Sequence, residues 1–366
     1  MTETIKLQAK GFYDEFVRKG GTNLRSTHYC AGCGHGIINK LIAEAITELG
    51  IGDKTVFVNP VGCGVFCYYY IDCGHIAGPH GRAAAVATGA TRALKDKVVI
   101  AYQGDGDLAA IGFNNAFQAA NRGEKFAHIF INNAIYGMTG GQLAPTSLIG
   151  QKTTTSPYGR DPLNDGYPVH VCEVFNQLQA PVYIERVAVT DTPNIMKAKR
   201  AIRKALEIQR DGRGYAFVEI LSPCPTNFRM TPDAAAKWVA EEMTKVFPLG
   251  CLRDSSKEPS DLKLREWPEI NINDYFSSET GAIEPAKIDE KFAECRMKFS
   301  GFGGQGVLSL GHLIANAAQF DRRYVSWFPS YGPEQRGGSA SCSVVVSGKP
   351  IGSPSVEETD VLVAMN

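Results

Sequence analysis

The sequence predicts an α/β protein whose main domain is built on a parallel β-sheet. The apolar run Val98–Tyr102 is typical of a buried strand, Leu108 to about Arg122 of a helix, and Phe126–Ile131 of the next strand. Successive parallel strands end at the same edge of such a sheet, where open α/β folds hold ligands. We therefore expect the polar loops after these two strands to lie side by side.

Length and charge narrow the class of protein. At 366 residues the chain is long enough for two domains, and 38 Lys+Arg against 38 Asp+Glu give a net charge of zero. We expect neither nucleic acid nor an anionic membrane as a partner. The start lacks a signal-peptide pattern, and no apolar run approaches the roughly 18 residues that span a bilayer. The sequence thus indicates a cytoplasmic protein.

The two polar loops carry residues that suit a metal-bound phosphate. Gly104-Asp105-Gly106-Asp107 follows the first strand, and Asn132-Asn133 ends the second. A carboxylate, an amide oxygen and a backbone carbonyl are hard ligands that suit Mg²⁺. Glycines let the backbone approach a diphosphate closely. The alternative is an Asp-rich turn, with the asparagines capping the next loop.

The ten cysteines indicate metal ligation or redox chemistry, because the cytosol disfavours disulfides. Cys30 and Cys33 lie in a Gly-rich turn before an amphipathic helix, whose amino end favours thiolates. This Cys-x-x-Cys is compatible with a zinc half-site, a dithiol pair or half of an iron–sulfur site. A compact zinc ribbon would need a second such pair, so we favour a buried cluster. The further candidate ligands are Cys63, Cys67, Cys73 and Cys224.

Together with His80-Gly81-Arg82 and the Tyr-Gly-Met-Thr-Gly-Gly-Gln run, these motifs resemble the thiamine-diphosphate-binding beta subunit of 2-oxoacid:ferredoxin oxidoreductases over about residues 25–250. The resemblance implies that Mg²⁺ anchors the cofactor and that a [4Fe–4S] cluster lies beside it. The implied Mg²⁺ ligands are Asp105, Asn133 and the Ile135 carbonyl. The implied cluster ligands are Cys30, Cys33, Cys63 and Cys224. Many members have serine after the third cysteine, where this chain has glycine, so Cys67 and Cys73 stay as alternatives.

The resemblance also implies which residues surround thiamine diphosphate. They are His80, Gly104, Asp105, Gly106, Asp107, Asn133, Ile135, Gly137 and Thr139. His80 is the catalytic candidate, with a turn-capping histidine as the alternative. The glutamate that activates the cofactor is expected from the alpha subunit. We interpret His35, His75, His128 and His170 as structural.

The composition changes after about residue 252. We predict a first domain at 1–252, a linker at 253–294 and a second domain at 295–366. The glycines of 301–306 fit a dinucleotide fingerprint, but Asp321 precedes the next strand, which argues against a nicotinamide site. Together with the segment 330–338, the glycine-rich segment 301–306 resembles the gamma subunit of the same oxidoreductases. About 70 residues are roughly half of such a domain, so we expect a partial, parallel α/β gamma-type domain, truncated or completed by another chain.

We therefore expect a subunit of a 2-oxoacid:ferredoxin oxidoreductase that is active only with an alpha subunit. The family implies coenzyme A-dependent oxidative decarboxylation of a 2-oxoacid to acyl-CoA and CO₂. Electrons would pass through the cluster to a ferredoxin-like subunit and ferredoxin. The alternatives are a non-redox thiamine-diphosphate decarboxylase or synthase subunit with structural zinc, and a non-enzymatic zinc scaffold. The basic helix at 194–210 is interpreted as solvated, with ferredoxin docking as its alternative. The motifs leave the 2-oxoacid open.

Overall fold

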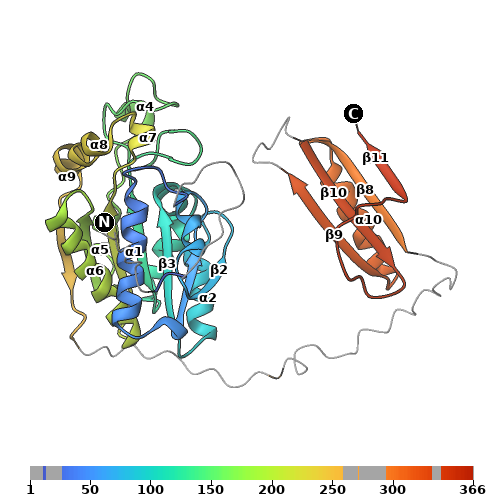
Figure 1. Cartoon of the computed structure of the whole chain (residues 1–366), viewed down its shortest axis with the longest axis horizontal. Helices are drawn as coiled ribbons and strands as arrows, with labels where there is room; N and C mark the ends of the chain where they lie inside the picture. Colours follow the sequence, from blue (N-terminus) through green and yellow to red (C-terminus); the bar gives the residue numbers. More distant parts are fainter. Residues whose placement is uncertain (1–10, 14–26, 259–270, 272–293, 332–338, 366) are drawn as a thin grey trace, which may run out of the picture. The chain divides into compact units, whose positions relative to one another are not determined.

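The chain divides into two compact units, residues 1–264 and 265–366 (Figure 1). The structure is a computed structural model, and it describes residues 11–13, 27–258, 271, 294–331 and 339–365. Most of the predicted linker at 253–294, and residues 332–338 of the gamma-like segment, lie outside the described residues. Within the described residues, no helix is long and apolar enough to cross a membrane.

The described part of the first unit contains a seven-stranded sheet in the order β2-β1-β3-β4-β6-β5-β7. Its neighbouring strands run parallel, except that β7 pairs antiparallel with β5 at one edge. The bounds are β1 Thr55–Asn59, β2 Gly74–Ala77, β3 Val98–Gly104, β4 Ala127–Asn132, β5 Tyr183–Ala188, β6 Ala216–Leu221 and β7 Gly250–Asp254. β3, β4 and β6 are adjacent, so the loops that leave them meet at one edge.

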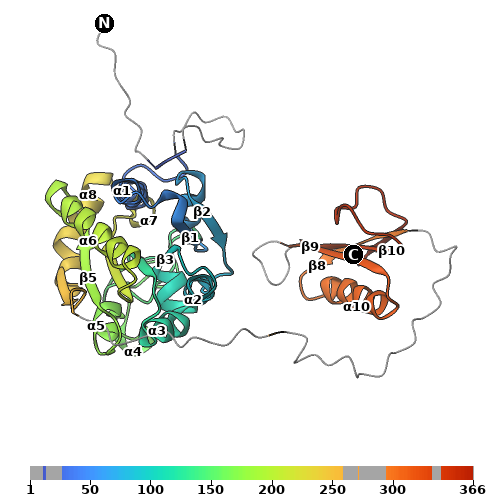
Figure 2. The same ribbon diagram turned by 90° about the horizontal axis from the view of Figure 1, so that it is seen from below.

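Helices cover both faces of this sheet (Figure 2). α1 (Gly34–Glu48) and α6 (Thr192–Arg210) pack on one face. α2 (Ala83–Ala93), α3 (Phe113–Asn121) and α5 (Val171–Asn176) pack on the other. The shorter helices are α4 Pro162–Asp165, α7 Pro225–Phe228, α8 Pro232–Trp238 and α9 Thr244–Val246, with 3₁₀ turns at Gly52–Lys54 and Cys63–Tyr69. This three-layer arrangement buries the sheet from both sides.

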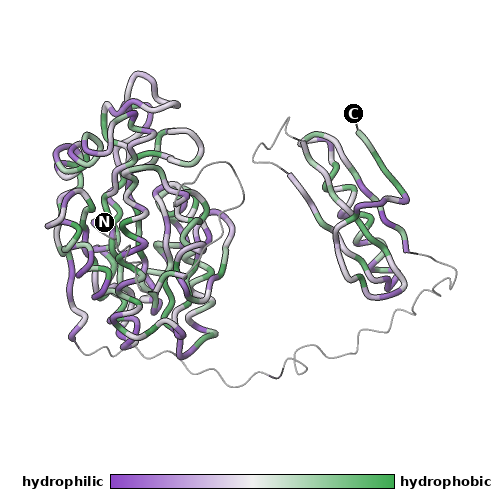
Figure 3. The backbone as a smooth tube through the Cα atoms, viewed as in Figure 1, coloured by the Kyte–Doolittle hydropathy of each residue, from purple (hydrophilic) through white to green (hydrophobic). Residues whose placement is uncertain are grey.

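Burial follows the apolar pattern of the strands, which are green along much of their length in Figure 3. β1, β4 and β6 are buried at every position, as expected for parallel strands covered on both faces. The small residues of α2 allow it to lie close against β3; Ala84 and Ala87 are fully buried. Buried polar residues at strand ends, such as Gln103 and Asn132, therefore need partners inside the protein.

The described part of the second unit is a four-stranded sheet with one helix. The strands are β8 Cys295–Phe302, β9 Tyr324–Tyr331, β10 Ser339–Ser347 and β11 Val361–Ala364, in the order β11-β8-β10-β9. α10 (Val307–Phe320) packs on it through a core that includes Val307, Cys342 and Val344. β10 runs antiparallel to β8 and β9, and β11 runs parallel to β8. The expectation of a parallel sheet was wrong here.

The predicted helix at 108–122 is interrupted. A π-helical turn occupies Gly106–Ile111 before α3 begins at Phe113. Gly112 N donates to Asp107 O at 2.9 Å, a bond to the fifth residue back that inserts one extra residue into the helix. A Cβ on Gly112 would meet the Gly81 carbonyl oxygen at 2.7 Å, so the loop before α2 packs directly against this turn.

Candidate functional site

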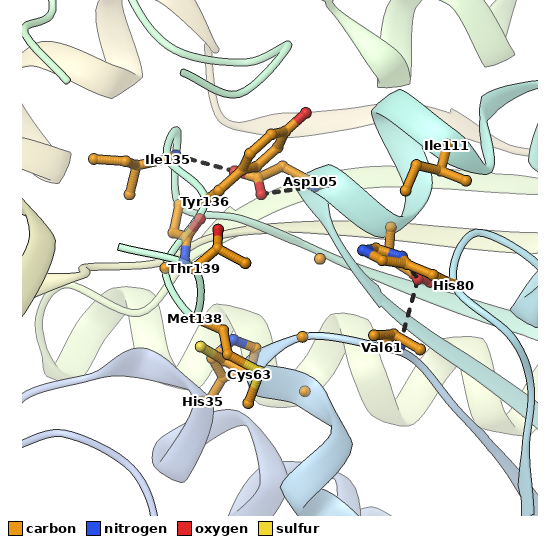
Figure 4. Close-up of a pocket in the computed structure, with 17 residues that line it drawn as sticks. His35, Val61, Cys63, His80, Asp105, Ile111, Ile135, Tyr136, Met138 and Thr139 are labelled. Carbon is orange, nitrogen blue, oxygen red and sulfur yellow. Dashed lines mark hydrogen bonds and ion pairs between the residues drawn. The ribbon is translucent and has the colours of Figure 1, made fainter. Parts of the chain in front are cut away.

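A cavity of about 290 Å³ opens at the edge of the sheet where β1, β3 and β4 end (Figure 4). Asp105, Ile135 and Tyr136 lie on one side and His80 and Ile111 on another, with Cys63, His35 and Met138 closing a third. Its lining residues are His35, Val61, Gly62, Cys63, Gly64, His80, Gly104, Asp105, Gly106, Asp107, Ile111, Asn133, Ile135, Tyr136, Gly137, Met138 and Thr139. All nine residues predicted to surround a cofactor are therefore brought together in one cavity.

Three oxygens converge between the ends of β3 and β4. Asn133 is oriented with its side-chain oxygen 2.7 Å from the Ile135 carbonyl oxygen and 2.9 Å from Asp105 Oδ2. If the amide is turned over, its nitrogen donates to both oxygens at the same distances. When the Asn133 oxygen points inward, the three oxygens repel one another, and a bound cation is needed to offset that repulsion. Mg–O distances of 2.0–2.1 Å place adjacent octahedral ligands about 2.9 Å apart, so in that orientation the Asn133 oxygen lies at the spacing of Mg²⁺ ligands from the other two oxygens.

The Asp105 carboxylate is held firmly in place. Its Oδ1 accepts from Gly106 N at 2.8 Å, and its Oδ2 accepts from Ile135 N at 3.1 Å and from the Thr146 hydroxyl at 3.3 Å. Burial raises the pKa of the Asp105 carboxyl to about 7, although these donors oppose the shift. A bound cation would favour the ionised form.

Ala134, between Asn133 and Ile135, has a φ of +55°, which is strained for a residue with a Cβ. The strain is held by side chains. Asn132 Oδ1 accepts from Ala134 N at 3.1 Å, and Ser147 and Gln151 donate to the Ala134 carbonyl at 2.6 and 2.8 Å. This left-handed residue turns the chain so that the Ile135 carbonyl faces Asn133.

Asn132 is anchored in turn by a buried ion pair. It donates to Glu219 Oε1 at 2.7 Å, and Arg186 Nε donates to Glu219 Oε2 at 2.8 Å. The side chains of Arg186 and Glu219 are both fully buried, and Arg186 also pairs with Glu173. The loop after β4 therefore rests on charges from β5 and β6.

His80 is oriented by the buried Asp107. His80 Nδ1 lies 2.5 Å from Asp107 Oδ1, which also accepts from Gly81 N at 2.7 Å. Gln103 Nε2 donates to Asp107 Oδ2 at 2.5 Å. The His80 side chain is 42 % exposed while that of Asp107 is 1 % exposed, so His80 is the half of the pair that reaches the cavity.

Four of the six candidate cysteines, namely Cys30, Cys33, Cys63 and Cys224, lie close enough to influence one another's ionisation. Burial, together with the neighbouring charges of Cys224, Cys63 and Cys30, raises the pKa of the Cys33 thiol to about 12. A Cβ on Gly137 would lie 3.3 Å from Cys63 Sγ and 3.6 Å from Cys224 Sγ, so these two sulfurs adjoin the cavity wall. Gly34 N donates to the Pro223 carbonyl at 3.3 Å, which joins the Cys30–Cys33 turn to the segment that carries Cys224.

Cys67 and Cys73 lie elsewhere. Cys67 is buried and donates to Asn59 Oδ1 at 3.0 Å, and Cys73 Sγ lies 3.7 Å from His75 Nε2. Within the described residues, no three His, Cys, Asp or Glu side chains form a site for one metal ion.

Burial opposes the ionisation that is expected for a thiol near the α1 amino end. Burial raises the pKa of the Cys33 and Cys63 thiols to about 12 and also raises that of Cys224. Desolvation thus outweighs the helix dipole, and a ligand that takes thiolates must displace protons.

The interpretation of His35 as purely structural was incomplete. Its Nδ1 lies 2.6 Å from the Tyr102 hydroxyl, and it also lines the cavity. Its position inside the Cys-Gly-His-Gly motif was the available signal. Thr139, which was predicted to surround the cofactor, lines the cavity, and its hydroxyl donates to Gln142 Oε1 at 2.5 Å. On the basic helix α6, Lys199 and Arg203 are paired with Glu48.

Two family models match this chain, one in each of its two compact units. Residues 60–220 match the family model of the thiamine pyrophosphate enzyme, C-terminal TPP binding domain, and residues 296–366 match that of pyruvate ferredoxin/flavodoxin oxidoreductase. The ketoisovalerate oxidoreductase subunit VorA of Methanothermobacter thermautotrophicus is 54 % identical over 368 residues, which span all of this chain and 77 % of that protein.

Two further relatives match a little under two thirds of the chain. The 2-oxoglutarate synthase subunit KorB of Archaeoglobus fulgidus is 35 % identical over 236 residues, 64 % of this chain and 83 % of that protein. The structure of 2-oxoglutarate:ferredoxin oxidoreductase from Magnetococcus marinus, with 2-oxoglutarate, coenzyme A and succinyl-CoA bound, has a TM-score of 0.52 at 28 % identity. That match covers 63 % of this chain and 82 % of the other.

Proposed function

This chain belongs to the subunits of 2-oxoacid:ferredoxin oxidoreductases, and on that premise we propose that it holds thiamine diphosphate through Mg²⁺ and carries a [4Fe–4S] cluster beside it. The whole-chain relationship to a ketoisovalerate oxidoreductase subunit favours a branched-chain 2-oxoacid as substrate. The products are the acyl-CoA and CO₂, and the electrons pass through the cluster to ferredoxin.

The trio of oxygens is the observation that carries the proposal. With its amide oxygen turned inward, Asn133 lies 2.9 Å from Asp105 Oδ2 and 2.7 Å from the Ile135 carbonyl oxygen, which is the spacing of neighbouring octahedral ligands. These three oxygens would hold Mg²⁺, and diphosphate oxygens and water would complete its coordination. Gly106 supports the fit, since a Cβ there would meet the Tyr136 ring at 2.9 Å and leave no room for the loop.

Thiamine diphosphate, when bound, supplies a nucleophilic carbon and an electron sink for decarboxylation of a 2-oxoacid. The residues of this chain hold it and shape its surroundings. His80 presents an imidazole nitrogen to the cavity as a proton acceptor, while Ile111 and Met138 add apolar surface to the cavity walls. At about 290 Å³ the cavity is at the lower end of ligand pockets, which fits completion by an alpha subunit.

Cys30, Cys33, Cys63 and Cys224 are the proposed cluster ligands. Their mutual proximity supports this set over Cys67 and Cys73, which bond to Asn59 and adjoin His75 instead. Asn227 donates to Cys224 Sγ at 3.4 Å and to the Gly137 carbonyl at 2.9 Å. Amide donors to sulfur tune the potential of such clusters.

The test is anaerobic reconstitution of the full chain with iron and sulfide. We expect a brown protein with charge-transfer absorption that is lost in Cys30→Ala and kept in Cys251→Ala, an exposed cysteine on β7. A colourless protein that binds one zinc would refute the cluster. With an alpha subunit, acyl-CoA product profiling would identify the 2-oxoacid. Oxidative decarboxylation by the chain alone would refute the required partner.

A further inference from the structure

A chain of hydrogen bonds leads from His80 into the apolar core. Beyond Asp107, Gln103 Oε1 lies 2.8 Å from His128 Nε2, and His128 Nδ1 lies 2.7 Å from the Tyr215 hydroxyl. Gln103, His128 and Tyr215 are fully buried. The aromatic rings of Phe126 and Phe217 contact His128, so the far end of the chain is enclosed.

With Asp107 ionised, one assignment of protons satisfies every link. Asp107 accepts backbone N–H bonds as a carboxylate and has no proton to give, so the Gln103 amide must turn its nitrogen toward it. The Gln103 oxygen then accepts from His128 Nε2–H. His128 Nδ1 is therefore an acceptor, and Tyr215 supplies the donor.

The same reasoning fixes His80 at the other end. Its Nδ1 must carry the proton that Asp107 accepts, which leaves Nε2 unprotonated in the neutral ring. Within the described residues, no hydrogen bond to His80 Nε2 is present, and the ring lines the cavity (Figure 4). His80 and His128 thus carry opposite tautomers.

We infer that Gln103, His128 and Tyr215 are positioning residues that fix the tautomer of His80, so that Nε2 faces the cavity as an acceptor. The use of that acceptor in catalysis rests on the proposed function, but the tautomer does not. This series of hydrogen bonds does not conduct protons. Burial raises the pKa of Tyr215 well above 10 and lowers that of His128 to about 3, so the inner end neither releases nor takes up a proton near neutral pH.

The tautomers can be measured directly on the full chain without cofactor. The seven histidines are labelled with ¹⁵N, and His80→Gln and His128→Phe identify the two signals. We expect His80 with the proton on Nδ1 and His128 with it on Nε2. At His80 we expect the Nδ1–H tautomer to exceed the Nε2–H tautomer by at least about tenfold. A hydrogen bond to a charged group contributes enough free energy to shift an equilibrium by more than that factor. The opposite tautomer at either ring would overturn the inference.

Gln103→Met removes both links of the amide while keeping the length of the side chain. Asp107 then loses its anchor at Oδ2, and we expect the His80 preference to fall below about tenfold. The matched control is Gln209→Met, a buried glutamine of α6 that donates to Gly214 O and should leave His80 unchanged. An unchanged ratio in Gln103→Met, or an equal change in Gln209→Met, would count against the inference.

Two further readouts separate the possible failures. If Gln103→Met does not fold, His128→Phe breaks the chain one link further and should shift the His80 ratio in the same direction. With an alpha subunit, Gln103→Met should lower kcat by about tenfold or more and leave thiamine diphosphate affinity within about twofold. If the protein bound no thiamine diphosphate but His80 and His128 still carried opposite tautomers, the proposed function would be refuted and the inference about the tautomers would stand.

Discussion

Asp105→Asn removes the negative charge from the three oxygens at the ends of β3 and β4. An asparagine keeps one oxygen for Gly106 N, but its amide nitrogen then faces Ile135 N and the Thr146 hydroxyl, so the folded fraction of the variant is checked before binding is measured. The metal site changes more, because a neutral amide replaces the charged ligand beside Asn133 and Ile135. Changes to residues that merely support metal ligands cost about 10–100-fold in affinity, so losing the ligand's charge should cost at least about 100-fold, or about 2.7 kcal/mol.

Calorimetric titration of thiamine diphosphate at saturating Mg²⁺ measures this loss. The matched control is Asp191→Asn. Asp191 caps α6 by accepting from Asn194 N, and asparagine caps a helix as well as aspartate does, so this variant should fold normally. It should bind as the wild type does. If Asp105→Asn bound thiamine diphosphate within about threefold of the wild type and still needed Mg²⁺, the convergence of the three oxygens would have no role in binding.

Three predictions concern stability, each read by chemical denaturation of the full chain. Burial lowers the pKa of His128 from 6.5 to about 3. Below about pH 6.5 the unfolded chain therefore binds a proton on this imidazole that the folded chain does not. The free energy of unfolding should fall by about 1.4 kcal/mol for each pH unit below that point. The slope should be absent in His128→Phe, and an equal slope would be inconsistent with a neutral buried ring. Ala134→Val should cost more than about 2 kcal/mol at its φ of +55°, while Ala134→Gly should stay within about 1 kcal/mol of wild type. Arg186→Met should cost about 3–5 kcal/mol by leaving Glu219 buried without its cation, and adding Glu219→Gln should recover part of that loss; no recovery would point to packing instead.

The main sheet and the family could be predicted because their signals are local. Apolar runs at 98–102 and 126–131 identify buried strands, and the spacing of Gly-Asp-Gly and Asn-Asn identifies the loops that follow them. The comparisons confirm the family and the thiamine-diphosphate-binding fold. The choice of Mg²⁺ ligands, cluster ligands and domain boundaries stays a prediction.

The rest depends on contacts that no local pattern encodes. Gln103 directly follows the predicted strand Val98–Tyr102, and nothing local indicates its partner. His128 lies 25 positions away, and Tyr215 lies another 87 beyond it. The π-helical turn depends on Gly81 packing against Gly112, which periodicity cannot reveal. The amino end of a helix was expected to suit thiolates, but the sequence does not show that burial raises the pKa of the Cys33 thiol.

The four neighbouring cysteines come from opposite ends of the first unit, and this sets an order of events during synthesis. Cys30 emerges early, but its counterpart Cys224 follows β6, after nearly two hundred further residues have been made. Contacts between such distant segments form late and slowly, since the intervening chain must fold first. Cys33 and Cys63 therefore wait as unpartnered thiols on a nascent chain, open to oxidation until β6 joins the sheet. A ligand that needs all four sulfurs can therefore bind only after β6 has joined the sheet.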